Sequence, residues 1–209
     1  MTTDALYIHS FNSAIFRLKD SIFCHDCMAS IRPVVSTTIC ITPKYTCRVF
    51  AVAAYQEQFK PLILAKGWGD RTASRQLGAL IWDKTNIKYA SFDAVVPIPL
   101  HWSRFAHRGF NQAEEIAQVV AVQSGKPLMH LLKRTRRTVF QSAIAANKRQ
   151  DNVQHAFALM RAQKNLYKDK HILLVDDLMT TGATIKSAAR ELIKLQPASI
   201  SVVVVCRVT

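Results

Sequence analysis

The chain has 209 residues, 49% of them hydrophobic and 20% charged, which is enough to bury the core of one α/β domain and a small appendage. No apolar run approaches the roughly 18 residues that a membrane-spanning helix requires, and the first residues show no basic-then-apolar signal pattern, so we expect a cytoplasmic protein without a membrane span. Lysine and arginine number 28 against 14 aspartate and glutamate, a formal net charge of +14. This excess favours contact with nucleic acid, because each neutralised phosphate releases counterions; solubility alone is the alternative.

Four cysteines lie within the first 48 residues, where we expect an amphipathic helix and a zinc-ribbon-like region, followed by a main domain over residues 49–209. Cys24 and Cys27 form a C-x-x-C pair, and Cys40 and Cys47 follow with the spacing C-x6-C. In a reducing compartment clustered cysteines bind zinc more often than they form disulfides. We therefore predict a structural zinc site on these four thiols; the alternative is that they are simply buried.

The segment from Cys47 to residue 121 predicts two strands and three helices. CRVFAVAAY is typical of a strand, and FKPLILAKGWGDRTASRQLGALIWDK predicts a short helix, a glycine-rich turn and a longer helix. DAVVPIP is an apolar strand that must stop at its two prolines, because neither can donate to a ladder. Asn111, with Glu114 three residues later, predicts a helix that opens with a capping box. Arg108 and Gln112 lie either at a surface helix entry or against a ligand.

A basic segment follows, KRTRRTVFQSAIAANKRQDN, with no apolar periodicity. A solvated loop is the usual meaning of such a run. The other possibility is contact with a nucleic-acid backbone, for which we expect these side chains: Lys133, Arg134, Arg136, Arg137 and Lys148.

The stretch ILLVDDLMTTGAT, residues 172–184, combines two carboxylates with a hydroxyl-rich turn. A short apolar strand is predicted over His171–Val175, with Asp176 and Asp177 in the turn that follows it. The apolar period then changes to that of a helix, and SISVVVVC supplies another strand. Such strand-helix-strand units form parallel sheets, whose ligands bind at the carboxyl ends of the strands.

The same turn suits a phosphorylated sugar. Gly182 lets a ligand approach the backbone closely, and the free amides at the start of the next helix favour a phosphate. Hydroxyl donors come from Thr180, Thr181 and Thr184. Asp176 and Asp177 suit sugar hydroxyls, or a divalent ion held through water. The alternative is that these aspartates and threonines only cap a turn and a helix.

The thirteen-residue stretch resembles the phosphoribosyl-pyrophosphate (PRPP) signature of the type I phosphoribosyltransferases. Residues 92–121, with a V-P-x-P strand end and an R-G-F-N-Q motif, resemble the ComF family of competence proteins, and the similarity continues through Gln141 and Arg149 to Ala156 and Phe157. The resemblance implies an α/β fold: a type I phosphoribosyltransferase-like parallel sheet flanked by helices, with a small N-terminal zinc-ribbon-like element.

The resemblance also implies roles for individual residues. It assigns the pyrophosphate of PRPP to the loop after the prolines, with Mg²⁺ on the pyrophosphate, and a catalytic role to Asp176 and Asp177. It places a mobile loop over PRPP in the basic segment. The PRPP contacts that it implies are Thr180, Thr181, Gly182, Ala183, Thr184, Pro97, Ile98, Arg108, Gln112, Gln141 and Arg149.

Three functions are compatible with these patterns. The family resemblance implies a protein of natural transformation that handles incoming single-stranded DNA, together with other DNA-uptake or recombination proteins. The alternative is an active phosphoribosyltransferase that transfers ribose phosphate to an unknown acceptor and releases pyrophosphate. A third possibility is a regulatory module that only senses PRPP.

Overall fold

The computed structural model describes residue 31 and residues 34–54, 71–100, 105–106, 109–135, 156–160 and 164–208. The chain separates into two compact units, Met1–Ile31 and Arg32–Thr209. The larger unit is described below. The domain boundary expected at residue 48 falls inside a strand, Tyr45–Ala54, so the main unit begins earlier than the cysteine pattern suggested.

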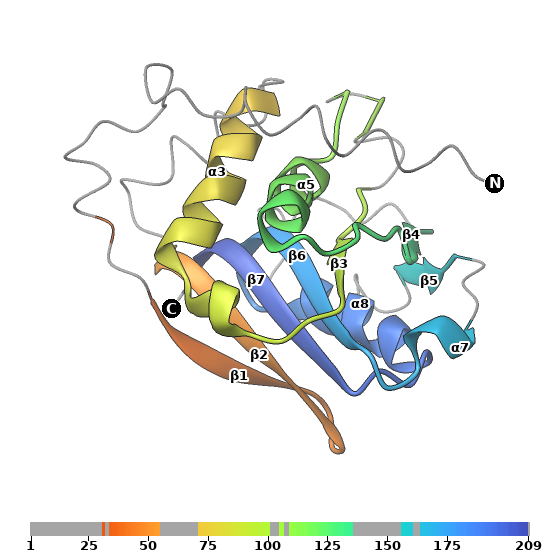
Figure 1. The fold of residues 1–209 in the computed structure, drawn as a ribbon. Coiled ribbons are helices and arrows are strands. Elements are labelled where there is room, and N and C mark those ends of the chain that lie inside the picture. The colour runs from red at the N-terminus through yellow and green to blue at the C-terminus, as the bar shows by residue number, and fades with distance from the viewer. Residues whose placement is uncertain are drawn as a thin grey trace. The chain divides into compact units, whose positions relative to one another are not determined.

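A five-stranded sheet forms the centre of the larger unit, in the order β1-β2-β7-β6-β3 (Figure 1). Its strands are β1 (Val34–Thr42), β2 (Tyr45–Ala54), β3 (Ala94–Pro97), β6 (His171–Met179) and β7 (Ser199–Arg207). β1 and β2 form an antiparallel hairpin, and all other pairs are parallel. The sheet is therefore mostly parallel, as the sequence predicted.

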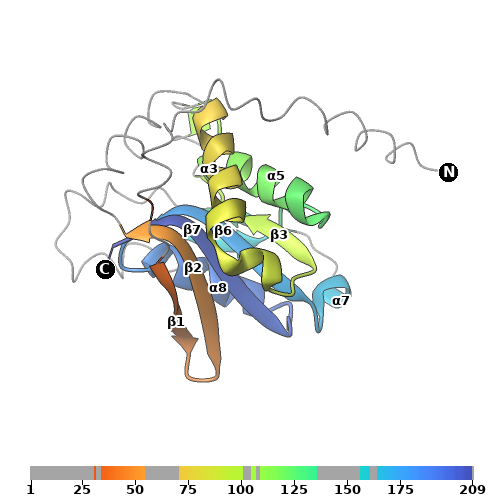
Figure 2. The same ribbon diagram turned by 60° about the vertical axis from the view of Figure 1, so that its left-hand side comes forward.

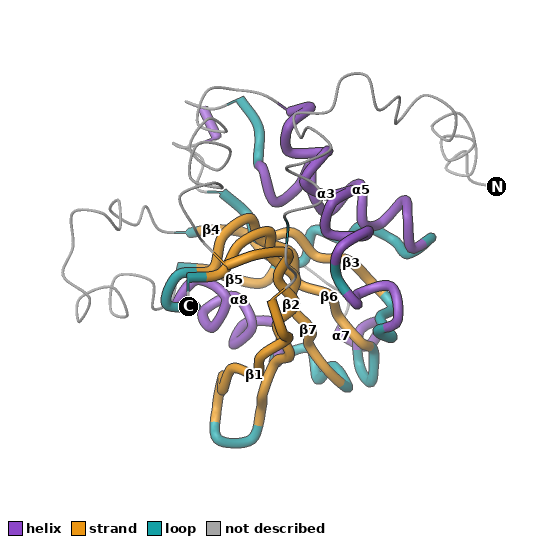
Figure 3. Tube along the Cα trace, turned by 90° about the vertical axis from the view of Figure 1, so that its left-hand side faces the viewer, coloured by secondary structure: helices purple, strands orange, loops and turns teal. Residues whose placement is uncertain are grey.

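Helices cover both faces of this sheet (Figures 2 and 3). On one face lie α3 (Arg71–Lys84), the 3-10 helix η4 (Asn86–Tyr89) and α5 (Gln112–Ser124); α8 (Ala183–Ile193) lies on the other. A second, two-stranded sheet of β4 (Leu132–Arg134) and β5 (Phe157–Leu159) and the short helix α7 (Lys164–Tyr167) complete the described elements. No helix among these is both long and apolar enough to cross a membrane.

The alternating side chains of the strands build two cores. Ile172, Leu174 and Val202 are buried in one cluster with the apolar side of α8. The intervening Leu173 and Val203 are also fully buried, and because successive side chains of a strand point to opposite faces, they lie under α3 and α5. Continuous apolar runs such as SISVVVVC are thus explained by burial on both faces.

The predicted strand-helix-strand unit is confirmed as β6, α8 and β7, with one correction. β6 continues past Val175 to Met179, in register with β7 as far as Arg207. Asp176 and Asp177 therefore stand in the last part of a strand rather than in the turn.

Candidate functional site

The connections of β3 and β6 leave the sheet in opposite directions. After β3 the chain passes through α5 to Leu128, which forms a parallel bridge with Val95 on the edge of β3 away from β6. After β6 it passes through α8 to β7, on the other side of β6. In open parallel sheets ligands bind at such a switch point, in the crevice beyond the carboxyl ends of the two strands. The relevant ends here are Pro97 and Met179.

Two adjacent carboxylates stand beside this point. Asp176 is in register with Val204 of β7, and its side-chain oxygen Oδ1 accepts a hydrogen bond from the backbone N–H of Asp177 at 2.9 Å. Burial raises the pKa of Asp176 well above its usual range, and the charge of Asp177 raises it further. The charge of Arg134 acts in the opposite direction. Such like-charge pairs with a perturbed pKa are a mark of functional sites.

The loop between β6 and α8 has the geometry of an anion-binding turn. Gly182 is the N-cap residue of α8 with φ 74°, in the left-handed region that favours glycine. It has no side chain to cap the helix, and the first turn of α8 carries no acidic residue. The exposed Thr181 accepts only a long hydrogen bond, 3.4 Å, from the backbone N–H of Ala183. The positive end of α8 thus points at the loop that the sequence assigned to phosphate.

The end of β3 is tied to β6 and to α5. The backbone N–H of Ile98 donates to the carbonyl of Val175 at 2.9 Å. The carbonyl of Ile98 accepts from the side-chain amide of Asn111, at the start of α5, at 3.0 Å. Asn111 is thus the residue here that the sequence interpretation missed.

The predicted capping box at Asn111 is wrong. Asn111 makes no side-chain cap hydrogen bond, and Glu114 instead lies 2.6 Å from the exposed His130. Neighbouring Glu115 is buried and binds Arg75 of α3 at 2.7 Å. Arg71, also on α3, donates to the carbonyl of Gly109 at 3.1 Å. The R-G-F-N-Q motif is therefore held by α3 as well as by β3.

Gln112 is 3% exposed, so it does not belong to a surface helix entry. Arg108, the other residue of that prediction, lies outside the described residues.

The comparisons with known proteins agree with this geometry. The family model of the phosphoribosyl transferase domain matches residues 101–209, just over half of the chain. The chain belongs to the phosphoribosyl transferase family.

Several relatives confirm the resemblance to the ComF family. Competence protein F of Haemophilus influenzae is 33% identical over 130 residues, 61% of this chain and 56% of that protein. Competence protein ComFC of Bacillus subtilis is 34% identical over 108 residues, 51% of this chain and 41% of that protein. The DNA utilization protein YhgH of Escherichia coli K12 is 32% identical over 124 residues, 55% of this chain and 49% of that protein. The chain thus spans about half the length of these relatives.

The basic segment begins as a strand rather than as a loop. Leu132–Arg134 pairs with Phe157–Leu159, and the guanidinium of Arg134 lies 5.2 Å from the centre of the Phe157 ring. Lys133 is exposed, whereas Arg134 is half-buried and interacts with Asp176 through its charge. The other predicted contacts of this segment lie outside the described residues: Arg136, Arg137, Gln141, Lys148 and Arg149.

The two described cysteines of the predicted zinc site lie on opposite faces of the β1–β2 hairpin. Cys40 pairs with Thr46 and is exposed, whereas Cys47 pairs with Ile39 and is fully buried, with its pKa raised by burial to about 12. A buried thiol of this kind resists the deprotonation that zinc binding requires. Because their side chains point to opposite faces of the hairpin, Cys40 and Cys47 do not fit one ion as placed.

Cys24 and Cys27 lie outside the described residues, and the four-cysteine zinc site stays a prediction. Clearly less than one zinc per chain, in protein purified without chelator, would refute it.

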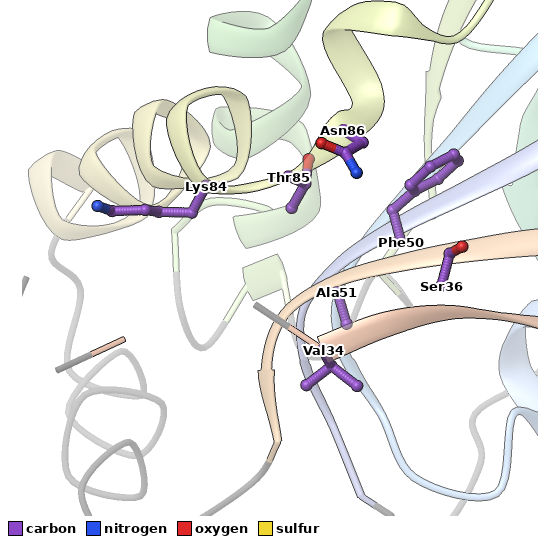
Figure 4. A pocket seen from close by; sticks show the side chains of 7 residues that line it. All are labelled: Val34, Ser36, Phe50, Ala51, Lys84, Thr85 and Asn86. Atoms are coloured by element: carbon purple, nitrogen blue, oxygen red, sulfur yellow. The ribbon is translucent and has the colours of Figure 1, made fainter. Parts of the chain in front are cut away.

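A cavity of about 350 Å³ lies elsewhere, between the hairpin and the end of α3 (Figure 4). It is lined by Val34, Ser36, Phe50, Ala51, Lys84, Thr85 and Asn86. Neither aspartate of β6 lines it. It is therefore distinct from the crevice at the switch point.

Proposed function

We propose that residues 32–209 form a phosphoribosyltransferase-like domain that binds PRPP, or a related phosphorylated ribose, at the carboxyl ends of β3 and β6. The observation that carries the proposal is the position of the Asp176–Asp177 pair, one loop before the glycine-capped start of α8, at the switch point of the sheet. A carboxylate pair suits the ribose hydroxyls, and the start of α8 suits the 5′-phosphate.

In the proposed complex the ligand spans three segments. The 5′-phosphate lies on residues 180–184, the ribose on the aspartates, and the pyrophosphate on the end of β3 at Pro97 and Ile98. The two carboxylates fit the oxygen ligands that Mg²⁺ takes, directly or through water. When bound with PRPP, Mg²⁺ would offset the charge of the pyrophosphate. From the segments outside the described residues we infer further phosphate contacts by Arg108, Gln141 and Arg149.

The biological role that we propose is in DNA uptake or DNA utilisation. Two relatives are named as competence proteins and a third as a DNA utilization protein, and the formal charge of +14 suits a nucleic-acid partner. We infer that single-stranded DNA contacts Lys133, Arg134, Arg136, Arg137 and Lys148. We further propose that other DNA-uptake or recombination proteins act with this chain, in the cytoplasm.

DNA binding has a quantitative signature. The logarithm of the affinity for single-stranded DNA should fall with the logarithm of salt concentration, by about 0.7 for each phosphate neutralised. Charge reversal at Arg136 and Arg137 should flatten that slope. An unchanged slope would remove these two residues from the DNA site.

The ligand proposal is tested by calorimetry with PRPP and Mg²⁺. Wild type should bind, and the double variant Asp176→Asn/Asp177→Asn should lose affinity by about 100-fold or more, because two charge-assisted hydrogen-bond acceptors are lost. Asp83→Asn is the matched control, since Asp83 is an exposed aspartate of α3. Binding by the double variant as tight as that of wild type would contradict the proposal.

An active transferase is the second candidate, favoured by the raised pKa of Asp176. It is distinguished by release of pyrophosphate from PRPP in the presence of an acceptor. PRPP binding without release, across nucleobase, amine and single-stranded DNA acceptors, would instead support a binding or sensing role.

A further inference from the structure

Asn111 has an unusual hydrogen-bond arrangement for an asparagine at the start of a helix. At this position the side-chain oxygen normally accepts from the helix's own first N–H groups. Here the side chain is turned toward β3, and its amide nitrogen donates to the carbonyl of Ile98 at 3.0 Å. The orientation is fixed by chemistry, because only the amide nitrogen of asparagine can face a carbonyl oxygen. The contact joins residues 13 positions apart in the sequence.

This orientation leaves the other end of the side chain unsatisfied. The oxygen Oδ1 of Asn111 is buried and has no hydrogen-bond donor. A buried acceptor without a donor is destabilising, and each such group in a folded protein calls for an explanation. The Asn111 side chain thus makes the contact with Ile98 while it neither caps α5 nor has a donor for its oxygen.

That contact is made by a residue of the proposed pyrophosphate site. Ile98 follows the last residue of β3, is 3% exposed, and its N–H donates to Val175 at 2.9 Å. Val175 directly precedes Asp176. A continuous chain of hydrogen bonds therefore runs from α5 through the end of β3 to the strand that carries the aspartates.

The first turn of α5 is anchored in addition by the ion pair between Glu115 and Arg75 of α3, 2.7 Å. α5 is thus a fixed support, and Asn111 is the point at which that support holds the β3 loop. Removing its amide would free the loop while leaving the helix attached to α3.

We propose that Asn111 is a positioning residue, which clamps the loop after β3 at the place where the pyrophosphate end of the ligand binds. The identity of the ligand in this inference rests on the proposed function. The clamp itself rests only on the hydrogen bonds of Asn111 and Ile98. With the ribose on the aspartates and the 5′-phosphate on the start of α8, which leads to β7, the remaining end of the ligand lies toward β3, the other neighbour of β6. The buried Oδ1 is then available to a water molecule that arrives with the ligand, since the pyrophosphate itself offers acceptors.

The test uses Asn111→Asp and Asn111→Ala in the full chain, with Asn86→Ala as matched control. Asn111→Asp keeps the shape but replaces the donor by an acceptor facing the Ile98 carbonyl. Asn86 is an exposed asparagine at the start of η4, and it lines the separate cavity of Figure 4. Two ligands separate the two halves of the site: inorganic pyrophosphate with Mg²⁺, and ribose 5-phosphate.

Both Asn111 variants should weaken pyrophosphate binding about tenfold, the order expected when a buried carbonyl loses its donor. Ribose 5-phosphate binding should stay within about twofold of wild type, since its contacts lie on β6 and α8. Hydrogen exchange without ligand should be faster in peptides covering residues 94–100 of both variants. Asn86→Ala should change none of these values.

Unchanged pyrophosphate affinity in the Asn111 variants would overturn the inference, and so would an equal loss for both ligands together with a lower melting temperature, which is the signature of a merely structural role. If wild type bound neither ligand, the proposed function would fail. Faster exchange at residues 94–100 would then still support the clamp, and unchanged exchange would refute it.

Discussion

An aspartate lies at each end of β6, Asp93 beside the amino end and Asp176 near the carboxyl end, and the two behave in opposite ways. At the amino end, Asp93 accepts from the backbone N–H of His171 at 2.8 Å and donates its own N–H to the His171 carbonyl at 2.7 Å, and the His171 ring lies 2.8 Å from the Ser199 hydroxyl. The hydrogen bond from His171, reinforced by the charge of Lys170, lowers the pKa of Asp93. At the carboxyl end, burial and a second carboxylate raise the pKa of Asp176.

The difference indicates that the amino end of β6 serves stability and that the carboxyl end is suited to a ligand. Paired polar groups at the amino end stabilise the folded state by themselves. Adjacent carboxylates at the carboxyl end, together with the unsatisfied Oδ1 of Asn111, are unfavourable by themselves, and in the proposed function a ligand supplies their partners. Proteins depart from local optimisation in this way mainly at functional sites.

Among the single substitutions below, the largest expected effect comes from one of two glycines with the same backbone conformation, one before α8 and one after α5. Gly182 has φ 74° beside the aspartates, and Gly125, at the C-cap of α5, has φ 67°. An alanine Cβ would meet only an ordinary contact at Gly182 and nothing at Gly125. Gly182→Ala and Gly125→Ala should therefore each lower the free energy of unfolding by about 1 kcal/mol, through left-handed strain alone.

Ligand affinity separates these two variants. Gly182→Ala should weaken PRPP binding by about tenfold or more, because a shift of the loop disturbs the phosphate contacts, whereas Gly125→Ala should bind as wild type does. Denaturant unfolding and calorimetry check both numbers. Equal affinity of the two variants would remove the α8 loop from the site.

Asp93→Ala removes the carboxylate that accepts from the His171 N–H at the amino end of β6. It should lower the free energy of unfolding by about 1 kcal/mol at neutral pH, because the His171 N–H loses its acceptor. Since the folded-state pKa of Asp93 is lowered, its contribution is present above the unfolded pKa and is lost as pH falls through the folded-state pKa. The difference from wild type should vanish in acid, and PRPP affinity should not change. A difference that persists in acid would show that the carboxylate charge is not its origin.

Asp176→Asn should have the reverse effect on stability. A carboxyl whose folded-state pKa is raised stabilises the fold only while protonated, and this contribution is lost as pH rises through the folded-state pKa. The neutral variant should therefore gain about 1 kcal/mol over wild type at neutral pH, since it removes a half-buried charge that lies beside a second carboxylate. Urea unfolding across a pH series measures this gain. A loss of stability at neutral pH would instead show that the charged carboxylate of Asp176 stabilises the fold, through the hydrogen bond that it accepts from the Asp177 N–H.

Arg134→Met should produce the smallest effect. Its charge opposes the rise in the pKa of Asp176, so removing it should move the pH at which PRPP affinity increases to higher values. Affinity at neutral pH should fall by about threefold, as expected for a partly screened charge interaction. Lys133→Met, at the exposed neighbouring position, should leave the pH profile unchanged. Identical profiles for the two variants would exclude the link between Arg134 and Asp176.

The sequence predicted the local parts of this arrangement well. The change of period after Thr184 identified α8, and the apolar runs on either side identified β6 and β7. The features that the sequence did not predict depend on contacts between residues far apart in the chain. β6 reaches Met179 because β7 offers ladder partners as far as Arg207.

The same limit explains the other differences. Asn111 does not cap α5 because a carbonyl of β3 takes its amide, and no local pattern encodes that contact. The cysteine spacing suggested a separate ribbon, yet β2 pairs with β7 and draws the hairpin, with Cys40 and Cys47, into the central sheet. A spacing pattern reports neighbours along the chain, whereas the face on which a cysteine lies depends on strand pairing.

The most direct test of the account is a hydrogen-exchange footprint of PRPP with Mg²⁺ on the wild-type chain. We predict slower exchange in peptides covering residues 98–100, 111–115 and 176–186, and no change at residues 91–93, 168–171 and 196–199. Protection confined to the amino end of β6, or to the residues around the cavity in Figure 4, would contradict the assignment of the ligand to the carboxyl ends of β3 and β6.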